Sequence, residues 1–250
     1  MSARPHKGRG AISRHEGRFA ARPIEFSAEE TALRNAAVPE TVLTAMQAGT
    51  IISRNTSPDV PFDRSINPYQ GCEHGCIYCY ARPTHSYLDL SPGLDFETHI
   101  FYKPNAASRL LEEWERPAYD CKPITIGANT DPYQPAEKST HITRQLLELF
   151  DKHNHPVNLI TKGTLISRDI DLLAGLASRR LCSVAISLPT MSAPLKRVME
   201  PRVPSAAART PTCSVSDSRQ PASATASREN AISKTSTAAN FSAQGPGSLA

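Results

Sequence analysis

Between residues 123 and 199, short apolar runs alternate with segments whose apolar residues recur at helical spacing. Strands are predicted at 64–69, 123–129, 157–161 and 182–188, and helices at 105–114, 140–153, 168–178 and 193–199. Because the strand runs are apolar throughout, both of their faces should be buried, as in a parallel sheet covered by helices. Short connections favour βαβ units with right-handed crossovers. The sequence therefore predicts an α/β fold with about four βα units.

The composition changes on both sides of this region. Residues 1–62 show little periodicity except at 29–47, which is predicted to be helical with Ser27 as its cap. Residues 205–250 number 46, of which 26 are Ala, Ser or Thr. Such a segment cannot bury enough apolar surface to offset the entropy lost on ordering. We therefore expect a basic, largely disordered arm (1–62), a folded core (63–204) and a disordered tail (205–250).

The alternation stops abruptly near residue 205. A sheet of four strands that ends there would leave one edge and several apolar faces uncovered. We interpret this loss of the alternating pattern as the result of a frameshift or a misplaced gene end. The sheet of the folded core would then keep one uncovered edge.

The charge and the cysteines bear on the partners and the compartment. The net charge is +4, and the first 22 residues carry six Arg or Lys against one acid, Glu16. Such an arm binds nucleic acid weakly, although a solvated tail is the simpler interpretation. No apolar run is long enough to span a membrane or to serve as a signal core. Three of the six cysteines lie within eight residues, which is typical of metal ligands in a reducing compartment. We expect a cytoplasmic protein without a membrane partner.

The clustered cysteines are Cys72, Cys76 and Cys79, in the pattern CxxxCxxC. An iron–sulfur cubane takes thiolates, normally four of them. Three thiolates would leave the fourth iron open to a small chelating molecule. Gly71 and Gly75 flank the first cysteines and allow tight turns, which bring backbone N–H groups close to the cluster sulfurs. The segment therefore predicts a [4Fe-4S] site with one open iron.

Two alternatives compete with this interpretation. A tetrahedral zinc site would need a fourth ligand, for which His74 or His85 is near in the sequence. Zinc sites usually pair two CxxC units or use histidines at fixed offsets, and only one CxxC unit, Cys76 to Cys79, is present. The second alternative is chance clustering of unrelated thiols. The spacing of the soft sulfur donors favours iron–sulfur over both.

The cysteine segment, with Tyr78 just before the last cysteine, resembles the signature of the radical S-adenosylmethionine (SAM) superfamily. The runs GLDFETHIFYKPNAA, GANTDPYQPAEK, LITKGTLISRDIDLL and MEPRVPS resemble a bacterial branch related to spore photoproduct lyase, over about residues 60–205. The resemblance implies an incomplete (β/α)6 partial barrel and a [4Fe-4S] cluster on Cys72, Cys76 and Cys79. It also implies SAM on the open iron and its reductive cleavage to a 5′-deoxyadenosyl radical. The electron would come from an external donor such as flavodoxin or ferredoxin.

The resemblance also implies a SAM site at the carboxyl ends of the strands, where parallel α/β barrels keep their active sites. The residues are Tyr78 near the adenine, Asn129, Thr130 and Asp131 after one strand, Lys162 after the next, and Ser187 on the fourth strand. Local structure offers an alternative for each position. Asn129 and Asp131 would cap a turn before Pro132, Lys162 would be a solvated loop charge, and Ser187 would have only a local role.

The substrate is left open, with nucleic acid as one class that the lyase resemblance and the basic arm favour. The lyases place a hydrogen-donating cysteine at the position matched by Asn129. An amide cannot donate a hydrogen atom as a thiol can, so the resemblance does not extend to that step. The alternative to a radical SAM enzyme is a truncated, catalytically inactive fragment that at most binds an iron–sulfur cluster.

Overall fold

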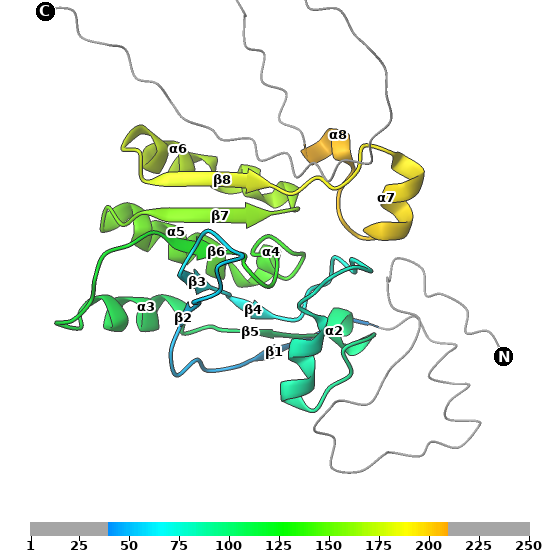
Figure 1. Cartoon of the computed structure of the whole chain (residues 1–250), viewed down its shortest axis with the longest axis horizontal. Helices are drawn as coiled ribbons and strands as arrows, with labels where there is room; N and C mark the ends of the chain where they lie inside the picture. Colours follow the sequence, from blue (N-terminus) through cyan, green and yellow to red (C-terminus); the bar gives the residue numbers. More distant parts are fainter. Residues whose placement is uncertain (1–39, 210–250) are drawn as a thin grey trace, which may run out of the picture.

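The computed structural model describes residues 40–209 (Figure 1). Residues 1–39 and 210–250, which make up most of the predicted basic arm (1–62) and of the predicted tail (205–250), lie outside the described residues. The described part of the predicted tail, 205–209, is not disordered as expected, because it forms the short helix α8 (Ala206–Arg209), in which Arg209 is buried. The larger sheet has the order β2-β3-β6-β7-β8. Its strands are β2 (Ile52–Arg54), β3 (Arg64–Ile66), β6 (Ile124–Ile126), β7 (Val157–Thr161) and β8 (Cys182–Ile186). β3, β6, β7 and β8 pair in parallel, which confirms the predicted α/β class.

A second sheet was not predicted. Its strands are β1 (Val42–Ala45), β5 (His99–Tyr102) and β4 (Tyr69–Gln70), in the order β1-β5-β4. The helix predicted over 29–47 is wrong at β1, where four extended residues pair in parallel with β5. The β-branched residues Val42 and Thr44 suit an extended chain, and the pairing overrides the weak helical pattern. β1 and β2 both lie before residue 63, so strands of the described structure extend into the segment 1–62.

The strand predicted at 64–69 is divided between the two sheets. β3 ends at Ile66, and β4 begins at Tyr69. Pro68 has no N–H group to donate to a ladder, so the pairing stops there. The chain therefore leaves the larger sheet immediately before the cysteine segment.

Helices cover one face of the larger sheet. The predicted helices are observed as α3 (Ala106–Trp114), α5 (Ile142–Lys152), α6 (Ile170–Ser178) and α7 (Ala193–Met199), with the short elements η1 (Arg82–Leu88), α2 (Asp95–Thr98), α4 (Glu137–Thr140), η2 (Thr164–Asp169) and α8 (Ala206–Arg209). The apolar sides of α3, α5 and α6 form one buried core with β6 and β7. Within the described part of the chain, no helix is long and apolar enough to cross a membrane.

The two faces of β7 differ in burial. Val157, Leu159 and Thr161 are buried, whereas Asn158 and Ile160 on the opposite face are half-buried. β8 is more open still, because it pairs only with β7 among the described strands. The prediction that both faces of every strand are buried is therefore wrong for β8, which no described strand flanks on its outer side. The carboxyl ends of β7 and β8 point toward α7 and α8 (Figure 1).

A buried ionic network joins α4, η2 and α5. Nη2 of Arg168 lies 2.7 Å from Oε1 of Glu137 and 2.8 Å from Oδ2 of Asp169. Arg144 completes the cluster, with Nη1 2.9 Å from Oδ1 of Asp169. Both carboxylate side chains are fully buried, so each depends on its cationic partners.

Substitution of Arg168 by methionine should lower the free energy of unfolding by about 2 to 3 kcal/mol, because it leaves Glu137 and Asp169 short of one cation in the interior. Urea unfolding measures the change. The matched control is Arg179→Met, which removes the partner of Asp151 in a pair with both side chains partly exposed and should cost less than about 1 kcal/mol. Equal effects of the two substitutions would contradict the interpretation.

Candidate cofactor site

The cysteine loop follows β4 and turns tightly. Cys72 and Cys76 are buried, and Cys79 is half-buried. Gly71 and Gly75 have φ of +84° and +66°, a region that favours glycine, as the sequence predicted. A Cβ atom at Gly71 would lie 2.9 Å from the Cδ1 atom of Ile100. The loop therefore packs too closely against β5 to admit a side chain at this position.

Arg82 fixes the backbone in the middle of the loop. Its Nε and Nη2 atoms donate to the carbonyl oxygen of Cys76 at 3.2 and 2.9 Å. Its Nη1 atom donates to the carbonyl oxygen of Gly93 at 3.0 Å. The charge is balanced by Glu97, whose fully buried carboxylate lies 2.6 Å from Nη2. Sequence analysis missed both residues, although they lie in or beside the runs that carry the family resemblance.

The three thiols influence one another. Burial raises the pKa of Cys76, and Cys72 adds to the shift. Burial also raises the pKa of Cys79, again with a contribution from Cys72. The thiols of Cys76 and Cys79 therefore both lie within electrostatic reach of Cys72. Three soft donors in one tight loop fit an iron–sulfur cluster.

In the described structure, the side chains of the cysteine loop are not arranged around a single metal ion. Among residues 40–209, no three His, Cys, Asp or Glu side chains are grouped so as to hold a metal ion. A cubane takes one thiolate at each of three irons, so its ligands need not converge on one point. The spacing and the chemistry of the donors therefore remain compatible with a cluster that fills the loop.

His74 pairs with a carboxylate instead of facing the solvent. Its Nδ1 atom lies 3.4 Å from Oδ2 of Asp131, and the two side chains are 3% and 7% exposed. Burial opposes the charge on His74, but Asp131 and Cys72 raise its pKa to about 10. The pair with Asp131 engages the Nδ1 atom of His74 in the described structure. His85 is also engaged, with Nε2 2.9 Å from the carbonyl oxygen of His99.

Asp131 joins the ends of β6 and β7. Its carboxylate accepts the hydroxyl of Thr161 at 2.6 Å and the backbone N–H of Lys162 at 2.6 Å. It also accepts the backbone N–H of Tyr133 at 2.9 Å, which is the local turn that the sequence offered as an alternative. Burial opposes its ionisation, but the pair with His74 holds the pKa of Asp131 below its usual range. Asp131 therefore braces the strand ends, with its oxygens already occupied.

The other two members of the predicted triplet face different ways. Thr130 is 3% exposed, and its hydroxyl donates to the carbonyl oxygen of Tyr69 at 2.8 Å. Asn129 is exposed, and its backbone N–H donates to Oδ1 of Asn67 at 2.9 Å. Of the triplet, only Asn129 offers its side chain to a ligand.

Three predicted residues meet around one carboxylate that was not predicted. Nζ of Lys162 lies 3.1 Å from Oε1 of Glu200 and donates to Oγ of Ser187. The hydroxyl of Tyr78 donates to the same Oε1 atom, and Nζ of Lys162 lies 5.6 Å from the centre of the Tyr78 ring. Arg209 contacts the other carboxylate oxygen, with Nη2 2.9 Å from Oε2. The structure thus brings together Tyr78, Lys162 and Ser187.

Glu200 is the centre of this network. Its side chain is fully buried. Burial opposes its charge, but the hydroxyl of Tyr78 and the cations of Lys162 and Arg209 hold its pKa below the usual range. Arg209 also donates from Nη1 to the carbonyl oxygen of Ser187 at 2.7 Å. Glu200 lies in the MEPRVPS run, the one signal by which the sequence could have identified it.

The segment around Glu200 also bonds directly to the cysteine loop. The backbone N–H of Ile77 donates to the carbonyl oxygen of Met199 at 3.0 Å. The backbone N–H of Arg202 donates to the carbonyl oxygen of His74 at 3.3 Å. The cysteine loop and the residues after α7 therefore form one side of the site at the carboxyl ends of β7 and β8.

Two proteins of similar sequence are described only as uncharacterised proteins. One, from Mycobacterium tuberculosis, is 41% identical over 150 residues, which cover 60% of this chain and 44% of that protein. The other, from Methanocaldococcus jannaschii, is 28% identical over 140 residues, which cover 56% of this chain and 49% of that protein. The chain therefore spans about half the length of the curated relatives that it matches.

Solved structures of spore photoproduct lyase have a similar fold. A variant with bound AdoMet and dinucleoside spore photoproduct matches with a TM-score of 0.50 and 18% sequence identity, over 76% of this chain and 51% of that chain. A lyase complexed with dinucleoside spore photoproduct alone matches with the same values. At this identity the similarity concerns the fold, and it agrees with the partial barrel that the sequence predicted.

The family comparison covers the whole site. The model of the radical SAM superfamily matches residues 66–211. This range is more than half of the chain and includes the cysteine loop, the ends of β6, β7 and β8, and Glu200. The chain therefore belongs to the radical SAM superfamily.

Proposed function

We propose that this protein is a radical SAM enzyme, which binds a [4Fe-4S] cluster through Cys72, Cys76 and Cys79 and binds SAM beside it. The cluster, when bound, supplies the electron for reductive cleavage of SAM to a 5′-deoxyadenosyl radical, which then acts on a substrate. One observation carries the proposal. A lysine and a serine from adjacent strand ends converge with an aromatic side chain of the cysteine loop.

Each residue has a role that its surroundings support. Lys162 offers a positive charge for the carboxylate of SAM, and Ser187 offers a hydroxyl beside it. The ring of Tyr78, about half exposed, offers an apolar face for the adenine. Asn129 contributes an exposed amide, whereas Asp131 acts indirectly, because it holds the backbone N–H of Lys162.

Thr130 belongs to the supporting structure in this proposal. Its hydroxyl bonds to the residue at the start of β4, Tyr69, and so ties the turn after β6 to the strand that enters the cysteine loop. Glu200 and Arg209 complete the support. The carboxylate of Glu200 holds the ammonium group of Lys162 near Tyr78. Arg209 pairs with the same carboxylate and compensates its charge in the interior.

Nucleic acid is the substrate class that we favour. The support is the shared fold with a lyase whose solved structure contains a dinucleoside spore photoproduct. We further propose that the electron comes from a separate one-electron donor of the flavodoxin or ferredoxin type. The alternative is an inactive fragment that at most binds the cluster.

The experiment that tests the function is anaerobic reconstitution of the full chain with iron and sulfide, followed by reduction in the presence of SAM. We expect about four irons per chain, an EPR spectrum that changes when SAM is added, and release of 5′-deoxyadenosine. Iron without a SAM-dependent change or deoxyadenosine would support the inactive fragment. Absence of a stable cluster would contradict the proposed enzyme and would also support the inactive fragment.

Substitution of Lys162 by methionine should weaken SAM binding about tenfold or more, because it removes the charge-assisted contact with the SAM carboxylate. Iron content should stay unchanged, since the cysteines are intact. Titration of the EPR change with SAM gives the affinity. Lys138→Met, at an exposed position of α4, is the control and should bind SAM as the unmodified chain does. An unchanged affinity in the Lys162 variant would rule out the proposed contact.

A further inference from the structure

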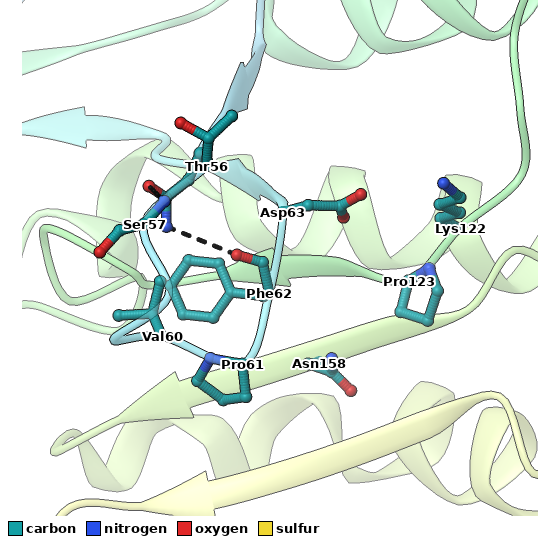
Figure 2. Close-up of a pocket in the computed structure, with 10 residues that line it drawn as sticks. Thr56, Ser57, Val60, Pro61, Phe62, Asp63, Lys122, Pro123 and Asn158 are labelled. Atoms are coloured by element: carbon teal, nitrogen blue, oxygen red, sulfur yellow. Dashed lines mark hydrogen bonds between the residues drawn. The ribbon is translucent and has the colours of Figure 1, made fainter.

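Two recesses open near the amino-terminal ends of the parallel strands, away from the cysteine loop. One, of about 510 Å³, lies between the loop that joins β2 to β3 and the residues Pro123 and Asn158 (Figure 2). The other, of about 370 Å³, is lined by Arg54, Arg64 and the segment that follows α3. Successive strand residues alternate between faces, so the two recesses lie on opposite faces of the β2–β3 hairpin.

The second recess, which we call the arginine recess, carries an excess of positive charge. Arg54, Arg64 and Arg116 line it, with Glu113 as its one acidic lining residue. The carboxylate of Glu113 is committed to the backbone, because Oε1 accepts the N–H of Ile51 at 2.5 Å. Within residues 40–209, no carboxylate pairs with Arg54 or Arg116. The lining residues therefore carry an excess of two positive charges, because three guanidinium groups face one carboxylate.

The positive charge of Arg64 is buried and only partly balanced by a carboxylate. Its side chain is 3% exposed, and its nearest carboxylate is Asp120, 3.4 Å away and 61% exposed. It also donates to the carbonyl oxygen of Asp120 and lies 5.5 Å from the ring centre of Tyr119. Its Nε atom is buried without a hydrogen-bond partner. A buried guanidinium held this way is stabilised by any further anion nearby.

The strand register adds a second source of repulsion. Arg54 and Arg64 are directly opposite each other in the antiparallel β2–β3 pair. Like charges at such positions destabilise a sheet. An anion between the two guanidinium groups would turn this repulsion into two attractive contacts.

We propose that the arginine recess binds the phosphate group of a small phosphorylated molecule. Guanidinium groups present forked donors that match phosphate oxygens in bidentate contacts. The excess of two positive charges matches a phosphate dianion, and a volume of about 370 Å³ lies in the range of small-molecule sites. The recess and Lys162 lie at opposite ends of the strands, so a phosphate bound here leaves the candidate SAM site free.

Calorimetric titration of the full chain with orthophosphate tests the proposal, at constant ionic strength set with chloride. The variant is Arg54→Gln/Arg116→Gln, which changes only exposed lining residues and leaves buried Arg64 in place. The matched control, Lys138→Gln/Lys152→Gln, also removes two exposed positive charges. A short single-stranded oligonucleotide serves as a second ligand. It distinguishes a free phosphate from the phosphate of a nucleic-acid backbone.

We expect saturable orthophosphate binding by the unmodified chain and the control, weakened at least tenfold in the Arg54/Arg116 variant. If only the oligonucleotide shows this loss, the recess binds the phosphates of a nucleic acid, and the proposed small phosphorylated ligand is overturned. If neither ligand distinguishes the variant from the control, the proposal is overturned. None of these outcomes depends on iron or SAM, so the test is independent of the proposed enzymatic function.

Discussion

Replacing Cys76 by alanine should abolish cluster binding, so that the reconstituted variant holds almost no iron or sulfide and lacks the brown chromophore. Two thiolates cannot hold a cubane as three do. The backbone at this position is also held in place, because Arg82 donates two hydrogen bonds to its carbonyl oxygen. Iron and sulfide analysis after anaerobic reconstitution measures the loss.

Cys121→Ala is the matched control for this substitution. Cys121 is a free thiol at an exposed position outside the loop, so its removal should leave about four irons per chain. The assignment of the ligands fails if the Cys76 variant retains a full complement of iron. Circular dichroism of both variants separates loss of the cluster from loss of the fold.

Replacing Gly127 by alanine should lower the free energy of unfolding by about 4 kcal/mol, which combines a strained backbone with an overpacked interior. Gly127 follows β6 with φ of +91°. A Cβ atom there would lie 2.2 Å from the carbonyl oxygen of Ile160 and 2.8 Å from Cδ of Pro132. Neither the backbone of β7 nor the proline ring can move far, so the turn that presents Asn129 must shift. Denaturant unfolding measures the loss.

Gly49→Ala is the control, because a Cβ atom at Gly49 would meet no atom within 4 Å. This substitution should leave stability within about 1 kcal/mol of the unmodified chain. A Gly127 variant as stable as the Gly49 variant would show that the turn after β6 is not constrained as described.

The βα units could be predicted because their patterns are local. The apolar positions of α3, α5 and α6 repeat at helical spacing, and β6 and β7 are short apolar runs beside them. β1 could not be predicted, since all four of its residues are exposed and only its pairing with β5 makes it a strand. Pro68 was the one local signal for the division between β3 and β4. The prediction of a single strand over 64–69 gave this proline too little weight.

The candidate site also combines residues that have a local signal in the sequence with residues that depend on distant contacts. The cysteine loop could be identified from the sequence because the close spacing of its three cysteines is enough to predict a metal-binding loop. Lys162 and Ser187 came from the family resemblance, and strand pairing places them side by side, since the N–H of Ser187 donates to the carbonyl oxygen of Thr161. Glu200 escaped detection because a glutamate in a short polar run has no distinctive spacing. Its importance comes from contacts with residues far away in the sequence.

The hydrogen bonds between the cysteine loop and the segment after α7 determine when, during synthesis, the cysteine loop can reach its final structure. Tyr78 and Glu200 are separated by 122 positions, and Arg202 bonds to the carbonyl oxygen of His74. A chain emerging from the ribosome folds its local elements first, and distant pairings must wait for their partner. The loop therefore acquires its full set of contacts only after most of the described chain has been made. If the loop binds the proposed cluster, its complete binding site would be available only late in the synthesis of this protein.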